Sequence, residues 1–409
     1  MGAIGRRVIR DEGARYRFLL GSCGVYTTLF LLQLYQTYSG LKPWAISGAA
    51  AAATVALMAL CIFAIPRLVP SRLSRAAVPL MLVVAATTSC ALPEPVDGVG
   101  MDTIVVTDSA RNRKFAIDMW YPSDDAHPDW YRPVPLVRPV FVSRGAKPAA
   151  GKHPLVLISH GALGFRYAQA WLAEQLASKG YIVAALDHPG SMRGNLTGEG
   201  MFTLWNRALD VTFAIDQLLA DKRWSSLIDA SKIGFNSHSA GGHTGLLLAG
   251  GHFDPRVFRA YRDTNPSGDI YAKELKQYDA LEATIDATPY QKSYRDARIG
   301  AFLLMAPSPV TGFDAKSLQQ ITAPVRIYAS KRDEINPLEA HALFAAHNIP
   351  GASLRINDAG HFVYVVGGSI FGKRAIPSIF DDASDIDRTR IQAELAIDAS
   401  NFFDDKLGH

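Results

Sequence analysis

The sequence predicts an α/β domain with a doubly wound, mostly parallel sheet, preceded by N-terminal transmembrane helices. From about residue 93 onward, short apolar runs alternate with stretches of helical periodicity, which is typical of parallel βαβ units. Before that point, three uncharged stretches are each long enough to cross the roughly 30 Å hydrocarbon core of a bilayer. We therefore divide the 409 residues into a membrane region, 1–92, and a large domain, 93–409.

The membrane region contains three candidate spans. They lie between Arg17 and Lys42, between Lys42 and Arg67, and between Arg75 and Glu94. Arginines gather before the first span and between the second and third, and the positive-inside rule keeps such flanks in the cytoplasm. A cleaved signal peptide has a single short apolar core, so it is the weaker alternative. The sequence predicts a multi-pass protein of the cell membrane with its large domain on the extracytoplasmic side.

Charge and cysteine content exclude several classes of function. Residues 1–90 hold 9 Lys+Arg against 2 Asp+Glu, which leaves 33 against 36 for the rest of the chain. A domain with this balance offers no cationic face for a phosphate backbone, so we expect no nucleic-acid binding. All three cysteines precede residue 91, so the large domain has no thiolate nucleophile, disulfide or cysteine-ligated zinc.

The elements of the large domain follow from its apolar patterning. Continuous or alternating apolar runs predict strands at residues 104–106, 115–121, 154–159, 181–186, 233–236, 301–305, 325–329 and 353–356. Helical periodicity predicts helices at residues 168–179, 204–219, 241–249, 337–347 and 388–403.

Residues 251–299 interrupt this alternation. The spacing of Tyr271, Leu275, Tyr278 and Leu281 predicts one amphipathic helix in the interruption. The segment is either an excursion packed on the core or a lid insertion whose apolar face shapes a substrate pocket.

The segment around Ser239 is the most informative part of the chain. It reads Ser237-His-Ser-Ala-Gly241, between a predicted strand and a predicted helix. This is the G-x-S-x-G nucleophile elbow with Ser237 in place of the first glycine. Small residues at the two flanking positions allow a tight turn that exposes the central serine. Ser239 is therefore the predicted nucleophile.

A serine nucleophile needs an imidazole to accept its proton and a carboxylate to orient that imidazole. In this architecture the acid and then the histidine follow the serine along the chain. His361 lies in a loop directly after a predicted strand, where the base belongs. Asp333, in the loop after the preceding strand, is the predicted acid, with Glu334 and Asp358 as alternatives. A helix cap is the other interpretation of Asp333.

The charge that develops on the substrate oxygen needs preorganised N–H donors. We predict an oxyanion hole formed by the backbone amides of Ala240, directly after the nucleophile, and Ala162, in the loop His160-Gly-Ala-Leu-Gly164. An ordinary glycine turn is the alternative for this loop. The histidines of the domain match no helical metal-binding signature, so we expect neither a metal nor a cofactor.

These stretches together resemble bacterial α/β-hydrolases related to platelet-activating factor acetylhydrolases and to predicted dienelactone hydrolases. The resemblance covers residues 92–365 and includes Met119-Trp-Tyr-Pro122, His160-Gly-Ala-Leu-Gly-Phe-Arg166 and the elbow. It implies an α/β-hydrolase fold that cleaves carboxylic esters, often short acyl groups on lipids, without a cofactor. Two departures limit it. Dienelactone hydrolases use a cysteine nucleophile, and the place of the acid in animal acetylhydrolases here reads Leu304-Met-Ala306.

The sequence thus predicts a membrane-anchored serine hydrolase that cleaves short-acyl or lipid-like esters through an acyl-enzyme intermediate. An acyltransferase or amidase is the alternative within enzymes, because water, an alcohol or an amine can each resolve an acyl-enzyme. A non-catalytic binding module that has kept the fold is the alternative outside enzymes.

Overall fold

The computed structural model describes residues 98–125, 127–264 and 268–409. The three predicted membrane spans lie outside these residues. In the part of the chain that is described, no helix is both long enough and apolar enough to cross a membrane.

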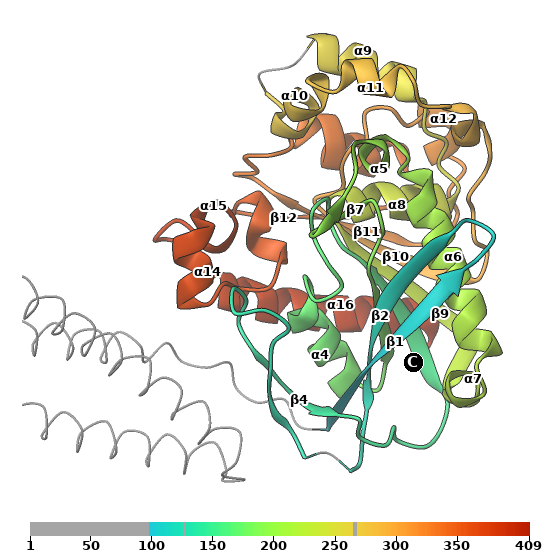
Figure 1. Cartoon of the computed structure of the whole chain (residues 1–409), viewed down its shortest axis with the longest axis vertical. Coiled ribbons are helices and arrows are strands. Elements are labelled where there is room, and N and C mark those ends of the chain that lie inside the picture. Colours follow the sequence, from blue (N-terminus) through green and yellow to red (C-terminus); the bar gives the residue numbers. More distant parts are fainter. Residues whose placement is uncertain (1–97, 126, 265–267) are drawn as a thin grey trace, which may run out of the picture. The chain divides into compact units, whose positions relative to one another are not determined.

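A ten-stranded sheet forms the centre of the described domain (Figure 1). Its strands are β1 (Val99–Asp108), β2 (Arg113–Pro122), β3 (Asp129–Tyr131), β4 (Val140–Arg144), β5 (His153–Ser159), β6 (Ile182–Leu186), β9 (Ile228–His238), β10 (Ile299–Met305), β11 (Val325–Ser330) and β12 (Ser353–Asn357). The spatial order is β12-β11-β10-β9-β5-β6-β2-β1-β4-β3, and neighbours from β12 to β6 are parallel. β2 pairs antiparallel with both β6 and β1.

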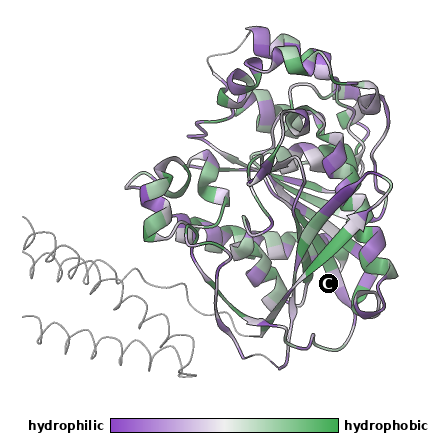
Figure 2. Cartoon of the chain, in the orientation of Figure 1, coloured by the Kyte–Doolittle hydropathy of each residue, from purple (hydrophilic) through white to green (hydrophobic). Residues whose placement is uncertain are grey.

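Helices cover both faces of this sheet. The helices α6 (Trp205–Ala220) and α8 (Ala240–Ala249) share a core with one face, and α4 (Ala170–Ser178) and α16 (Arg388–Leu407) share a core with the other. In Figure 2 the middle strands are mostly green, because a parallel strand covered on both faces is apolar throughout. The carboxyl ends of the parallel strands meet at one edge, where ligands bind in sheets of this kind.

The predicted alternation of strands and helices is confirmed. Each predicted strand of the large domain is present, and the helix expected at residues 337–347 begins as a π-helical turn, η2 (Glu339–Leu343), and continues as α13 (Phe344–Asn348). The elements that the sequence did not predict are short and carry little periodicity; besides β3 and β4 they include β7 (Ser191–Met192), β8 (Asn195–Leu196), α5 (Gly198–Phe202), α7 (Lys222–Leu227), α12 (Ala315–Leu318), η3 (His361–Tyr364), α14 (Ile370–Ala375) and α15 (Pro377–Phe380).

The prediction of one amphipathic helix within residues 251–299 is wrong. The described part of this insertion forms α9 (Pro255–Thr264), α10 (Ile270–Lys276), α11 (Asp279–Glu282) and the 3-10 turn η1 (Thr288–Gln291). The predicted helix is divided because α10 ends at its C-cap Gln277 and α11 begins after Tyr278. The start of α10 is fixed by Asp269, whose Oδ1 accepts the N–H of Ala272 at 2.7 Å. Its Oδ2 accepts a hydrogen bond from Nε2 of the buried His341 at 2.8 Å, which ties the insertion to η2.

Candidate active site

Ser239 occupies the sharp turn between β9 and α8. Its backbone has φ +54° and ψ −117°, a strained conformation for a residue with a side chain. Three hydrogen bonds hold it there. The Ser239 N–H donates to the Met305 carbonyl at 2.9 Å, and the Ser239 carbonyl accepts from the amides of Gly242 at 2.7 Å and Ser308 at 3.1 Å. The turn is therefore fixed by the end of β10 and by the first turn of α8.

The two small residues that flank the nucleophile in the motif, Ser237 and Gly241, have different surroundings in the turn. Gly241 cannot be replaced freely, because a Cβ atom there would lie 2.1 Å from the carbonyl oxygen of Ser159. Ser237, where the motif has glycine, is fully buried, and its hydroxyl finds no hydrogen-bond partner among the described residues. The turn accommodates this serine at the expense of one unpaired hydroxyl.

The structure brings Asp333 and His361 into contact. Oδ2 of Asp333 accepts a hydrogen bond from Nδ1 of His361 at 2.8 Å, and the two side chains are 6% and 2% exposed. Oδ1 of the same carboxylate accepts the amides of Ile335 at 2.9 Å and Asn336 at 2.8 Å. One carboxylate oxygen thus contacts the imidazole, and the other caps the turn after β11 rather than a helix, because the next helical segment starts only at Glu339.

This contact also sets the protonation states. Burial alone raises the pKa of the Asp333 carboxyl, but the neighbouring His361 and the hydrogen bonds that the carboxylate accepts outweigh burial and lower the pKa below its ordinary value. The carboxylate is therefore ionised at neutral pH and can only accept. Consequently the proton of a neutral His361 sits on Nδ1, and Nε2 is left as a base.

The two alternative acids have other partners. Oε2 of Glu334 accepts the backbone N–H of His361 at 2.9 Å and does not bond to the ring. Asp358 forms two hydrogen bonds of 2.7 Å with the guanidinium of Arg332. The geometry therefore favours Asp333 over both.

His361 lies against the elbow through His238, the residue before Ser239. The centroids of the two imidazole rings are 4.7 Å apart, and Nε2 of His238 donates to the carbonyl of His361 at 3.1 Å. Burial, followed by the charge of His361, lowers the pKa of His238 to about 3, so His238 stays neutral. The Ser239 hydroxyl makes no hydrogen bond to another described residue. In enzymes without bound substrate, the hydrogen bond from a nucleophile to its general base is commonly long and tightens when substrate binds.

The loop after β5 presents the Ala162 amide as a free donor. The Gly161 carbonyl accepts hydrogen bonds from Nδ1 of His160 at 2.6 Å and from the amide of Gly164 at 3.0 Å. The C=O and N–H of a trans peptide point in opposite directions, so the Ala162 N–H points away from these partners. Among the described residues it donates to no acceptor.

The second predicted donor is at the start of α8. Ala240 is the first residue of that helix, where an N–H has no intrahelical acceptor. The loop after β5 runs directly beside this point, because a Cβ atom on Gly161 would lie 3.1 Å from Cβ of Ser239. The two amides therefore lie on segments that meet at the serine.

A second Ser–His–Asp chain, which the sequence did not reveal, lies behind this loop. Oγ of Ser159 donates to Nε2 of His188 at 2.9 Å, and Nδ1 of His188 donates to Oδ2 of Asp210 at 3.1 Å. All three side chains are fully buried, so a substrate has no access to them. The signal that could have revealed the chain is the pair Arg207 and Asp210 on an apolar helix, because buried charges need partners.

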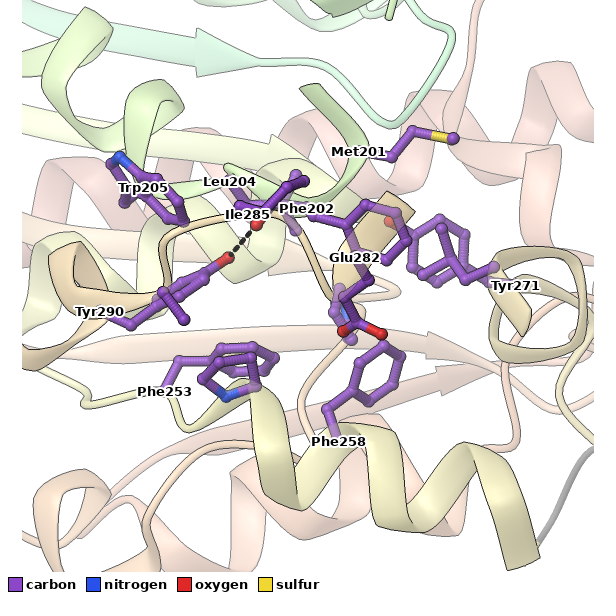
Figure 3. Close-up of a pocket in the computed structure, with 14 residues that line it drawn as sticks. Met201, Phe202, Leu204, Trp205, Phe253, Phe258, Tyr271, Glu282, Ile285 and Tyr290 are labelled. Atoms are coloured by element: carbon purple, nitrogen blue, oxygen red, sulfur yellow. Dashed lines mark hydrogen bonds between the residues drawn. The ribbon is translucent and has the colours of Figure 1, made fainter. Parts of the chain in front are cut away.

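An apolar pocket lies between α5, the start of α6 and the 251–299 insertion (Figure 3). Its lining includes Met201, Phe202, Leu204, Trp205, Phe253, Phe258, Tyr271, Leu275, Ile285, Tyr290 and Pro309. The Tyr290 hydroxyl donates to the Phe202 carbonyl at 3.1 Å, as Figure 3 shows. Glu282 is an acidic residue of the lining, and its Oε2 accepts a hydrogen bond from Nη2 of Arg262 at 2.5 Å. The pocket therefore presents apolar walls.

This pocket is linked to the elbow through its wall at Pro309. Nδ1 of His243, one helical turn after Ser239, donates to the carbonyl of Pro309 at 3.0 Å. The His243 ring also contacts Phe253, with centroids 4.5 Å apart. The pocket wall and the nucleophile turn are therefore parts of one packed unit.

The parallel sheet and the strained serine turn at the end of β9 define the class: this is a protein of the α/β-hydrolase fold. The family model of platelet-activating factor acetylhydrolase, isoform II, matches residues 136–192. The predicted resemblance to that family is confirmed over this segment, and its wider extent over residues 92–365 stays a prediction.

Several curated cutinases are similar to this chain in sequence. Cutinase est1 of Thermobifida alba is 26% identical over 229 residues, which cover 54% of this chain and 57% of the relative. Cutinase cut1 of Thermobifida fusca is 24% identical over 227 residues, which cover 54% of this chain and 53% of the relative. The match thus spans little more than half the length of these relatives.

Two solved structures are similar at the level of the chain trace. A ferulic acid esterase from Streptomyces cinnamoneus has a TM-score of 0.47 at 19% identity and covers 77% of this chain and 92% of its own. A dienelactone hydrolase from Anabaena variabilis has a TM-score of 0.42 at 16% identity and covers 75% of this chain and 99% of its own.

Proposed function

We propose that this protein is a serine carboxylic ester hydrolase with Ser239, His361 and Asp333 as its catalytic residues. The observation that carries the proposal is the 2.8 Å hydrogen bond between Asp333 and His361. The His361 ring packs against His238, which directly precedes Ser239 in its strained turn. The similarity to cutinases and acetylhydrolases supports the same reaction class.

The reaction proceeds through an acyl-enzyme. Nε2 of His361 takes the proton of the Ser239 hydroxyl as Oγ attacks the ester carbonyl, and the Asp333 carboxylate stabilises the imidazolium that forms. The amides of Ala162 and Ala240 donate to the oxyanion of the tetrahedral intermediate. The imidazolium then protonates the departing alkoxide. Water, deprotonated by His361, attacks the acyl group and releases the carboxylic acid.

The apolar pocket behind Pro309 suits the acyl group of a short-acyl or lipid-like ester. Removing an apolar chain from water contributes about 0.8 kcal/mol for each buried methylene, so a pocket with apolar walls favours chains that fill it. A series of p-nitrophenyl esters of increasing acyl length tests this assignment. We expect kcat/KM to rise with chain length until the pocket is full and then to fall.

The function itself is tested with p-nitrophenyl acetate and purified protein. Ser239→Ala and His361→Ala should each remove nearly all turnover, and the double variant should be little worse, because catalytic residues that act as a unit are not additive. Undiminished hydrolysis by Ser239→Ala contradicts the proposal. Failure of a fluorophosphonate to label the wild-type protein favours a non-catalytic module.

An acyltransferase or amidase with the same residues is the alternative reaction. Product analysis with and without an added alcohol or amine distinguishes it, since an acyltransferase forms the new ester or amide in preference to the free acid. Amide substrates test the amidase directly.

The cellular location is a separate proposal that rests on the sequence of residues 1–92. If the three predicted spans cross the membrane and their arginine-rich flanks stay in the cytoplasm, the catalytic domain lies on the extracytoplasmic side of the cell membrane. Protease treatment of intact cells tests it: digestion of the domain agrees with the proposal, and protection until the cells are lysed contradicts it.

A further inference from the structure

Arg207, on α6, is a buried cation that the proposed mechanism does not use. It is 1% exposed, and its guanidinium donates to four neutral oxygen atoms. Among the described residues no carboxylate is hydrogen-bonded to it, because nearby Asp210 already accepts from Arg111, Arg113 and His188. Burial lowers the pKa of Arg207 to about 9, so it is still charged at pH 7. Burying a cation without a carboxylate partner costs folding free energy. The groups to which Arg207 donates therefore indicate what the residue is for.

On one side, Arg207 holds the loop that carries Ala162. Its Nη2 donates to the backbone carbonyl of His160, and its Nη1 donates to the hydroxyl of Ser191 at 2.8 Å. The Ser191 carbonyl in turn accepts the amide of Leu163 at 3.0 Å. Leu163 has φ +57°, so the loop is strained directly after the donor and needs such support.

On the other side, Arg207 holds the first turn of α8. Its Nε donates to Oγ1 of Thr244 at 3.2 Å, and that hydroxyl donates to the carbonyl of Ala240 at 3.1 Å. The guanidinium therefore connects, through one or two bonds, the two segments that carry the proposed oxyanion donors.

The buried Ser159–His188–Asp210 chain fixes the remaining acceptor. The hydroxyl proton of Ser159 is directed to His188, so the lone pairs of its oxygen are free to accept from Nη2 of Arg207 at 3.2 Å. A guanidinium is planar and presents its donors in a rigid fork, whereas an ammonium is a point donor on a flexible stem. Only the fork can hold both sides at a fixed separation.

We infer that Arg207 is a positioning residue that sets the separation of the oxyanion donors Ala162 and Ala240. The inference rests on the proposed function, because it concerns the same site. It predicts that loss of the fork weakens binding of the tetrahedral intermediate and leaves binding of the ground-state ester largely unchanged.

The test compares Arg207→Met and Arg207→Lys with the wild-type full chain. The assays are hydrolysis of p-nitrophenyl acetate, normalised to the fraction of serine labelled by a fluorophosphonate, and inhibition by a trifluoromethyl ketone, whose adduct is tetrahedral. We expect kcat to fall about 100- to 1,000-fold in Arg207→Met, as for loss of one oxyanion donor, with KM changed far less. The inhibition constant should rise in proportion to the loss of kcat/KM.

Arg207→Lys separates positioning from charge. Lysine restores the positive charge but not the planar fork of donors. We therefore expect the kcat of Arg207→Lys to stay at least tenfold below that of the wild type. Full activity in Arg207→Lys overturns the inference. The inference is also overturned if Arg207→Met has the wild-type kcat per labelled serine. In that case Arg207 would serve folding alone, which lowers the fraction of protein that is labelled but not kcat.

Arg326→Met is the matched control. Arg326 is a partly buried arginine of another strand: it is ion-paired with Asp398 at 2.8 Å and, among the described residues, forms no hydrogen bond to the loop after β5 or to α8. If Arg207→Met does not fold, Thr244→Val and Ser191→Ala each remove one acceptor of the fork and should each lower kcat several-fold at constant KM; unchanged kcat in both overturns the inference. An inactive wild type would instead refute the proposed function.

Discussion

Asp333→Asn separates the orienting role of this carboxylate from its capping role. The amide oxygen can replace Oδ1 and keep accepting from Ile335 and Asn336, so the turn should survive. The amide nitrogen then replaces Oδ2 and donates to Nδ1 of His361, which moves the ring proton to Nε2. A ring protonated there cannot accept the proton of Ser239, and a wrong tautomer of this kind lowers kcat about 10⁴-fold. At 1.36 kcal/mol for each factor of ten, the barrier rises by about 5.4 kcal/mol.

Glu334→Gln is the matched control for this variant. Among the residues that the structure describes, the Glu334 carboxylate accepts a hydrogen bond only from the backbone amide of His361. A glutamine oxygen can accept the same bond, so we expect kcat to fall less than tenfold. The assay is hydrolysis of p-nitrophenyl acetate at pH 7, with the fluorophosphonate-labelled fraction as the measure of folded sites. A fully active Asp333→Asn beside an inactive Glu334→Gln would show that the wrong acid has been assigned.

Three further changes test other parts of the structure. Gly241→Ala should lower both the melting temperature and kcat, because its Cβ would lie 2.1 Å from a backbone oxygen, whereas Gly300→Ala, with 3.3 Å to the nearest atom, should be mild; equal effects contradict the elbow packing. The pKa of His243 is lowered by burial from 6.5 to about 3, so the unfolded state binds the extra proton below pH 6.5. Stability should therefore fall by about 2 kcal/mol for this group between pH 7 and pH 5, and urea unfolding of His243→Gln should show a correspondingly smaller fall. Met201→Trp should fill the apolar pocket and lower kcat/KM for a hexanoate ester by a larger factor than for an acetate ester; equal factors exclude this pocket as the acyl site.

The parallel sheet and the elbow were predictable because they depend on local patterns. Buried parallel strands are continuous apolar runs, and the turn at Ser239 requires small residues at fixed positions next to the serine. The same logic led to His361 and Asp333, since each follows a strand of the sheet and so must lie at its carboxyl edge.

The insertion and the buried network were not predictable in this way. The helical periodicity from Tyr271 to Leu281 continues across the break at Gln277 and Tyr278, where α10 ends and α11 begins, so the spacing of apolar residues gives no sign of that break. The fork of Arg207 likewise joins residues from three separate segments, and spacing along the chain carries no sign of such contacts.

Identification of the modified residue after fluorophosphonate labelling is the sharpest test, because the described residues include two candidate serines. Ser159 is hydrogen-bonded to the His188–Asp210 pair, and Ser239 is the serine proposed to react with the help of the His361–Asp333 pair. Mass spectrometry of the digested wild-type protein should find the added phosphonyl group on Ser239 and leave the buried Ser159 unmodified. Labelling of Ser159, or of neither serine, would contradict the assignment of the nucleophile and the mechanism built on it.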